Sequence, residues 1–295
     1  MQPAPMIHSD DFEQLGLWLR SGYGLLLAGV FGLTWGSFAN VCIHRIPRGE
    51  SLVYPPSACP HCRAQIAWYD NLPLVSWLLL RGRCRRCQGG ISAQYPLIEL
   101  VAALLALAVF RRFVIGDSAP LGIALSRFLT YFFFVITLLV LSVIDLRIQL
   151  LPDRITYPAI PLFFVLGRIC GQTSLADAAI GLVAGYAVIW GIATGYRVLK
   201  GREGLGLGDA KLLSLIGGLL GWQALPWTLF LGSVSGLLLS VPILLIRRRG
   251  SDEGGLLHSE VPFGPFLSLA AAVYVFFFVG RDPLSWLILK LSSWV

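Results

Sequence analysis

The sequence LGIALSRFLTYFFFVITLLVLSVID, residues 121–145, is a long apolar run that ends in an aspartate. Apolar runs of roughly 17 to 25 residues are typical of helices that cross a membrane. Over the 295 residues of the chain, 56% are apolar and only 13% are charged, and the mean hydropathy is +0.73. This composition is too apolar for a soluble domain. The sequence therefore predicts an all-α protein that crosses the membrane several times.

The other apolar runs divide the chain into about eight predicted membrane spans, one of them short. Met1–Glu13 is acidic and polar and lacks the pattern of a cleavable signal peptide, so we expect the first helix to remain in the protein. The predicted spans are Leu17–Ile43, Pro96–Phe110, Leu121–Ile144, Ile155–Cys170, Leu175–Leu199, Ala210–Leu220, Pro226–Ile246 and Pro262–Gly280.

The positions of the basic residues predict the orientation of these spans, because lysine and arginine gather in cytoplasmic loops. Three loops are basic, so we expect them in the cytoplasm and both termini outside. Arg111 and Arg112 lie on the opposite side, against this pattern. The net charge of +7 mainly reflects this topology and also favours attraction to anionic lipid. Because the arginines are divided among membrane loops, we do not expect nucleic acid as a partner. The basic loop residues are Arg45, Arg48, Arg63, Arg81, Arg83, Arg85, Arg86, Arg197, Lys200, Arg202, Arg247, Arg248 and Arg249.

Two aspartates lie where this topology places the cytoplasmic membrane face. Asp145 ends the third span, and Asp209 follows two glycines at the start of the sixth, in the sequence GLGD of residues 206–209. A carboxylate at the centre of a membrane helix costs about 2.5 to 3.5 kcal/mol on insertion scales, so its retention near the membrane indicates a function. Two carboxylates held close can share a proton, deprotonate a water and protonate a carbonyl. The pair therefore predicts aspartyl protease chemistry.

Each aspartate also has a purely structural interpretation. The segment 206–209 is compatible with a loop that ends in a helix N-cap. Asp145 is compatible with an ion pair to Arg147 or Arg154. Asp153 competes with Asp145 as the partner of Asp209, because it also precedes a helix start. The spacing alone leaves the choice between Asp145 and Asp153 open.

The loop between the first two spans contains two Cys-x-x-Cys pairs, CPHC at residues 59–62 and CRRC at residues 84–87. Their number and interval favour a tetrahedral zinc site. In a reducing cytoplasm the thiols are expected to bind metal instead of forming disulfides, and the metal would supply folding energy to a loop without an apolar core. Redox-active or unmetallated pairs are the alternatives. The predicted ligands are Cys59, Cys62, Cys84 and Cys87.

The other thiols and the neighbouring histidine are not needed for this site. Cys42 and Cys170 fall inside predicted spans, where an unpaired cysteine behaves as a small apolar side chain. His61 lies within the first pair, but four thiolates already complete a tetrahedral site.

These motifs together resemble those of the bifunctional prepilin peptidases, the inner-membrane leader peptidases and N-methyltransferases of type IV pilus and type II secretion systems. The resemblance covers nearly the whole chain, and several ordered motifs are more specific than any one of them. The similar segments are GSFANV at 36–41, HRIP at 44–47, the two cysteine pairs, DNLP at 70–73, YPLIEL at 95–100, ID at 144–145, LLPD at 150–153, GLGDAK at 206–211 and PFGPF at 262–266.

The resemblance implies a specific reaction. It implies that Asp145 and Asp209 are the catalytic pair and that Asp153 starts a helix. It also implies cleavage of the basic leader of prepilins and pseudopilins after a glycine, at the cytoplasmic face. Methylation of the new amino terminus with S-adenosylmethionine would follow. The cysteine loop, implicated in methylation, favours the bifunctional form, although the chain has no glycine-rich fingerprint of the Rossmann kind.

We therefore expect an all-α polytopic protein of the inner membrane, in contact with lipid, with a small cytoplasmic zinc-binding loop domain. The expected parts are an N-terminal segment and first helix over 1–43, the four-cysteine domain over 44–95 and the peptidase domain over 96–295. Residues 247–260 have the composition of a mobile loop, with a solvated linker as the alternative. Pro262 and Pro265 are expected to mark a plain helix boundary, with a broken helix start near the site as the alternative.

Three other functions are compatible with parts of the sequence: a peptidase without methyltransferase activity, a proton- or cation-coupled transporter, and a zinc-braced scaffold. A transporter predicts inverted repeats and charges near the bilayer midplane, and we find neither in the sequence. A scaffold needs no aspartate pair. The bifunctional peptidase is the leading prediction.

Overall fold

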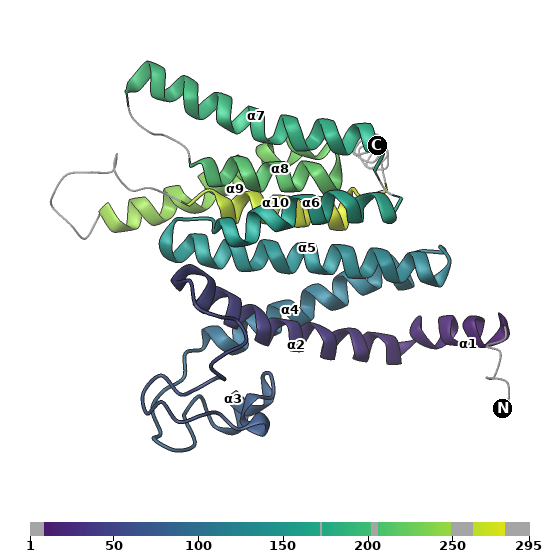
Figure 1. The fold of residues 1–295 in the computed structure, drawn as a ribbon, viewed down its shortest axis with the longest axis vertical. Helices are drawn as coiled ribbons and strands as arrows, with labels where there is room; N and C mark the ends of the chain where they lie inside the picture. Colours follow the sequence, from purple (N-terminus) through teal and green to yellow (C-terminus); the bar gives the residue numbers. More distant parts are fainter. Residues whose placement is uncertain (1–8, 172, 202–205, 249–261, 281–295) are drawn as a thin grey trace. The chain divides into compact units, whose positions relative to one another are not determined.

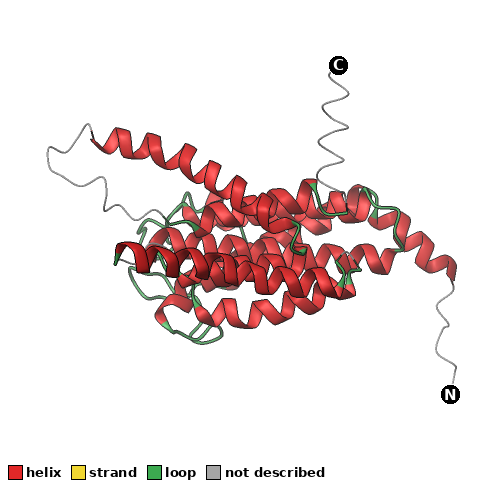
Figure 2. Ribbon diagram, turned by 90° about the horizontal axis from the view of Figure 1, so that it is seen from above, coloured by secondary structure: helices red, strands yellow, loops and turns green. Residues whose placement is uncertain are grey.

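The computed structural model describes residues 9–171, 173–201, 206–248 and 262–280, and these form helices and loops (Figures 1 and 2). The all-α prediction is thus confirmed for the described residues. The chain divides into two compact units, residues 1–132 and 133–295, with the boundary inside helix α5. Most of the predicted mobile loop at 247–260, and the first eight residues of the N-terminal segment, lie outside the described residues. The longer helices are α1 (Ser9–Leu19), α2 (Gly22–Arg45), α4 (Gln94–Phe110), α5 (Leu121–Ile148), α6 (Asp153–Ile169), α7 (Leu175–Lys200), α8 (Leu207–Leu220), α9 (Ala224–Arg248) and α10 (Gly264–Phe277).

In the first unit, α2 and α4 pack closely through small residues. A Cβ added to Gly32 would lie 2.6 Å from the Ala106 Cβ, and one added to Gly36 would lie 2.7 Å from the Glu99 Cα. Small residues at such crossings let helix backbones approach each other within a membrane. Because α2 ends at Arg45 and α4 begins at Gln94, this contact also fixes the two ends of the cysteine loop.

The first predicted span begins later than expected. Its predicted first residue is Leu17, but α1 ends at Leu19 and α2 begins at Gly22. The intervening Arg20 turns its guanidinium to the carbonyl oxygen of Ala119, 2.7 Å away. The chain therefore breaks where a charged side chain interrupts the apolar run, and the span corresponds to α2 alone.

In the second unit, α8 lies among the other helices. It packs against α6, α7, α9 and α10, and every residue from Leu212 to Leu220 is buried. The backbones of α7 and α8 touch, because a Cβ on Gly181 would clash with the carbonyl oxygen of Gly217 and one on Gly185 with that of Leu213. The shortest predicted span is thus a helix that faces protein on all sides along this stretch.

Within the described residues, three helices are long and apolar enough to cross a membrane by themselves: α2 with the turn that follows it (Gly22–Arg48), α5 and α7. The shorter apolar helices among the described residues include Ala224–Ser240 of α9 and α10. These helices identify a membrane protein, and the number of eight spans remains a prediction.

Candidate active site and metal centre

Asp145 lies in the last turn of α5 and is almost completely buried, with 5% of its surface exposed. Its Oδ2 accepts a hydrogen bond from the backbone N–H of Gly264, 3.1 Å away. The helix ends just beyond it, where Gln149 adopts a left-handed conformation with φ of 54° and Pro152 follows. The sequence thus stops α5 within one turn of the carboxylate.

Asp209 lies in the first turn of α8 and is half-buried. Its own N–H donates to the carbonyl oxygen of Gly206, the residue that precedes the helix. The carboxylates of Asp209 and Asp145 are close enough for electrostatic repulsion between them. Because the positive end of the helix dipole favours an anion in the first turn, α8 offsets part of that repulsion. The second unit therefore brings together two aspartates from different helices.

The two glycines before Asp209 have different surroundings. A Cβ on Gly208 would lie 3.1 Å from the Leu151 Cβ, so this position packs tightly against the segment after α5. Among the described residues, a Cβ on Gly206 would have one atom within 4 Å, the amide nitrogen of Gly208 at 3.9 Å. Gly208 thus allows a close approach to Leu151, while Gly206 is exposed.

Asp153, the competing carboxylate, has a different partner. It is the first residue of α6, and its Oδ1 lies 2.5 Å from the Nζ of Lys211 on α8. The same ammonium lies 4.6 Å from the centre of the Tyr157 ring. These contacts of Lys211 join the start of α8 to the start of α6.

The four cysteines of the loop form a cluster in the first unit. Their sulfur atoms all lie within 4.8 Å of one another, and the Sγ atoms of Cys59 and Cys87 are 3.8 Å apart. Zinc–sulfur bonds of about 2.3 Å in a tetrahedron place sulfurs about 3.8 Å apart, whereas a disulfide needs about 2.0 Å. The four thiols therefore fit a tetrahedral metal ion. The cluster consists of Cys59, Cys62, Cys84 and Cys87.

The two cysteine pairs have the same backbone conformation. In each pair, the first cysteine donates its N–H to the residue five positions later and accepts a bond from the residue four positions later, all at 2.9 Å. The residue four positions later is left-handed in both, Arg63 with φ of 56° and Gln88 with φ of 58°. An isolated bridge closes each turn, Ala58 with Gln65 and Arg83 with Gly90. The repetition presents two thiols from each turn to one point.

Backbone amides also prepare one thiol for metal binding. The N–H groups of Cys62 and His61 donate toward Cys59 and lower the pKa of its thiol to about 6. The thiolate is the form that binds metal. His61 itself turns its Nε2 to the carbonyl oxygen of Gly90, 3.1 Å away, and lies outside the four-sulfur cluster.

An ion pair braces the second cysteine turn against the middle of the loop. Arg85 donates from Nε and Nη2 to the carboxylate of Asp70, at distances of 2.6 to 3.0 Å. The hydrogen bonds from Arg85 hold the pKa of Asp70 below its usual range. Asp70 belongs to the short 3₁₀ helix Trp68–Asn71, so the pair joins that helix to the metal site.

Glu99 of α4 is a buried glutamate that lies within the YPLIEL motif. Its Oε2 accepts a bond of 2.8 Å from the N–H of Leu74, and its side chain also bonds with Ser37 of α2. Leu74 is left-handed with φ of 59°, a strained conformation that immediately precedes the short helix α3 (Val75–Leu79). A carboxylate inside an apolar run was the available signal. Glu99 thus connects the segment around Leu74 to both α2 and α4.

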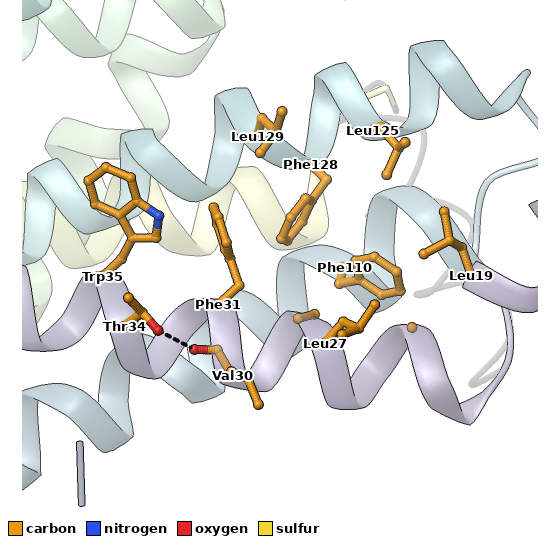
Figure 3. A pocket seen from close by; sticks show the side chains of 12 residues that line it. Leu19, Leu27, Val30, Phe31, Thr34, Trp35, Phe110, Leu125, Phe128 and Leu129 are labelled. Carbon is orange, nitrogen blue, oxygen red and sulfur yellow. Dashed lines mark hydrogen bonds between the residues drawn. The ribbon is translucent and has the colours of Figure 1, made fainter. Parts of the chain in front are cut away.

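The apolar hollow in Figure 3 lies elsewhere in the first unit, with a volume of about 630 Å³. Phe31, Trp35, Phe110 and Phe128 supply most of its aromatic lining, and none of its lining residues is titratable. Its chemistry suits an apolar group, so it is no candidate for hydrolysis.

Comparisons with known proteins bear on both units. A family model for the bacterial peptidase A24 N-terminal domain matches residues 30–113, and one for the type IV leader peptidase family matches residues 132–241. The chain is 40% identical over 271 residues to a protein of Aeromonas hydrophila, covering 83% of this chain and 87% of the relative. It is 37% identical over 279 residues to one of Pseudomonas putida, covering 87% and 92%. Both are named prepilin leader peptidase/N-methyltransferase. No solved structure matches.

Proposed function

Because the chain belongs to the type IV leader peptidase family, we propose that it cleaves the leader of prepilins and pseudopilins and then methylates the new amino terminus. The observation that carries the proposal is the approach of Asp145 and Asp209 at the ends of two helices. Family membership favours this function over a proton- or cation-coupled transporter.

Hydrolysis follows from a pair of carboxylates that shares one proton. A water between Asp145 and Asp209 gives a proton to the ionised carboxylate and attacks the scissile carbonyl carbon, while the protonated carboxyl gives its proton to the carbonyl oxygen. This forms a tetrahedral diol. The diol then returns one hydroxyl proton to the aspartate that was protonated at the start. The other aspartate, which took its proton from water, protonates the nitrogen as the C–N bond breaks. The products are a carboxyl terminus and a new amino terminus, and the pair regains its starting state.

The exposed backbone at Gly206 is the proposed approach for the substrate. A leader peptide must present an extended backbone at the scissile bond, and a position without a side chain lets that backbone come close. The substrate's apolar helix would remain in the bilayer and its basic leader would lie at the cytoplasmic face. We propose the bacterial inner membrane, with the active sites on the cytoplasmic side, because the basic loops follow the positive-inside pattern.

We assign metal binding to the four-cysteine cluster, and zinc as the metal, because four thiolates in a tetrahedron are typical of structural zinc. The metal would hold the two cysteine turns together in the proposed loop domain over 44–95. S-adenosylmethionine would supply the methyl group to the amine that cleavage frees. The remaining proposed parts are 1–43, with the first span, and the peptidase domain over 96–295.

A reconstitution experiment tests both activities. Purified protein in detergent is incubated with a model prepilin, with and without S-adenosylmethionine, and the products are measured by mass spectrometry. We expect cleavage in both samples and a methylated amino terminus only with the donor. Absence of cleavage would refute the peptidase proposal, and cleavage without methylation would identify a peptidase-only enzyme.

A further inference from the structure

Gly264 is in direct contact with the carboxylate of Asp145, from a segment 119 residues away in sequence. Its N–H donates to Oδ2 at 3.1 Å. A Cβ added at this position would lie 2.7 Å from the same oxygen and 3.3 Å from the Asp145 Cγ. Real Cβ atoms do not approach oxygens that closely without a shift of one of the groups. The contact therefore requires both the amide and the missing side chain.

The position of Gly264 in its helix explains why its amide is available. It is the first residue of α10, and the N–H groups of the first helical turn have no partner inside the helix. The preceding Phe263 provides no side-chain cap. Asp145 of α5 supplies the acceptor instead, and its carboxylate lies at the start of α10, where the dipole of that helix favours a negative charge.

Leu151 stabilises this arrangement from the other side. Its side chain lies 3.1 Å from the Cβ position of Gly208 and 3.6 Å from that of Gly264. Leu151 is buried and follows α5 directly, so it fills the space between the starts of α8 and α10. Gly264 therefore packs against the same leucine as Gly208, which helps to hold its amide beside Asp145.

We propose that Gly264 is a positioning residue that orients Asp145 as the base of the aspartate pair, an inference that rests on the proposed peptidase function. Its N–H holds Oδ2, which leaves Oδ1 to take the proton from water. A hydrogen bond from an amide stabilises a carboxylate more than a carboxylic acid. Asp145 is then the ionised member, and Asp209 carries the proton that passes to the scissile carbonyl oxygen.

The test compares Gly264→Ala with Gly195→Ala, whose Cβ would meet nothing within 4 Å. The Gly264→Ala enzyme should lose about 100-fold in kcat with KM changed by less than about threefold, since displacement of a catalytic group by about 1 Å has effects of this size. The acidic limb of its pH–kcat profile should move to higher pH, because the displaced carboxylate loses its N–H donor. Gly195→Ala should match the parental enzyme. An unchanged kcat and pH profile in Gly264→Ala would overturn the inference.

A second variant keeps the inference testable if Gly264→Ala fails to fold. Asp145→Glu preserves the carboxylate but carries it one methylene beyond the Gly264 amide, so its kcat should fall about 100-fold as well. Full activity of Asp145→Glu would show that the position set by Gly264 is unnecessary. A parental protein that cleaves no prepilin would instead refute the proposed function, so the two failures are distinguishable.

Discussion

Lys211 on α8 lies between Asp153, with which it forms an ion pair at 2.5 Å, and the ring of Tyr157, 4.6 Å from its ammonium. Asp153 and Tyr157 both belong to the first turns of α6. Lys211 follows Asp209 by two residues, so this ion pair connects the helix that carries Asp209 to its neighbour. Asp153 thus has a partner in the packing of the helices, while the carboxylates of Asp145 and Asp209 are close enough for electrostatic repulsion.

Replacement of either aspartate of the pair should abolish cleavage. We expect Asp145→Asn and Asp209→Asn each to lower the rate of leader cleavage by at least about a thousandfold, because an amide can neither accept the water's proton nor return it. Both proteins should still fold, since the amide keeps the size of the side chain. Gel assays of prepilin cleavage, with size-exclusion chromatography as the check of folding, give the answer. Parental rates in either variant would contradict the assignment.

Asp153→Asn should keep substantial cleavage activity. The amide still accepts a hydrogen bond from Lys211, and the loss of an exposed ion pair costs little, about 0 to 1 kcal/mol. The same gel assay measures the rate, and a thermal melt reports the stability. Complete loss of activity in a folded Asp153→Asn protein would make Asp153 the candidate partner of Asp209 again.

The cysteine cluster should contain about one zinc ion per chain, as expected for four thiolate ligands. Elemental analysis of purified protein measures the metal, and the Cys59→Ser, Cys62→Ser double variant should lose it. Cys42→Ser is a matched control, because Cys42 lies on α2 outside the cluster. An unchanged zinc content in the double variant would exclude the site.

In the same double variant, methylation should fall more than cleavage, because the loop depends on its metal and the aspartates lie on separate helices.

The two reactions should be separable. The Asp209→Asn protein should fail to methylate an intact prepilin, which has no free amine at the cleavage point, but should methylate a pre-cleaved one. An analogue of S-adenosylmethionine should block methylation without slowing cleavage. Mass spectrometry detects the added methyl group directly. If a folded, zinc-loaded Asp209→Asn protein cannot methylate the pre-cleaved substrate, one shared pocket carries both reactions.

The features that depend on spacing along the chain could be predicted from the sequence. The cysteine pairs repeat one short turn, so their interval alone indicated four converging thiols, which the described residues place together. Apolar runs likewise indicated the helices. The choice between Asp145 and Asp153 needed the family resemblance, because both residues lie near helix ends and the sequence does not record which helix each carboxylate faces.

Contacts across long sequence separations could not be predicted. The motif around Gly264 was visible, but nothing in its composition showed that the glycine amide meets Asp145. The break before α2 is accompanied by a hydrogen bond from Arg20 to the distant carbonyl oxygen of Ala119. The strained backbone of Leu74 likewise depends on a buried carboxylate from α4. Each of these features is decided by tertiary packing, which overrides local preference.

The burial of α8 bears on how the protein meets bilayers of different thickness. A helix of 14 residues rises about 21 Å, well short of the roughly 30 Å of a hydrocarbon core. A lipid-facing helix of that length would suffer hydrophobic mismatch, and the bilayer would thin or the helix would shift to correct it. Because neighbouring helices surround α8, the buried stretch Leu212–Leu220 packs against protein instead of acyl chains. The depth of Asp209 is therefore set by the helices around it and not by the thickness of the lipid.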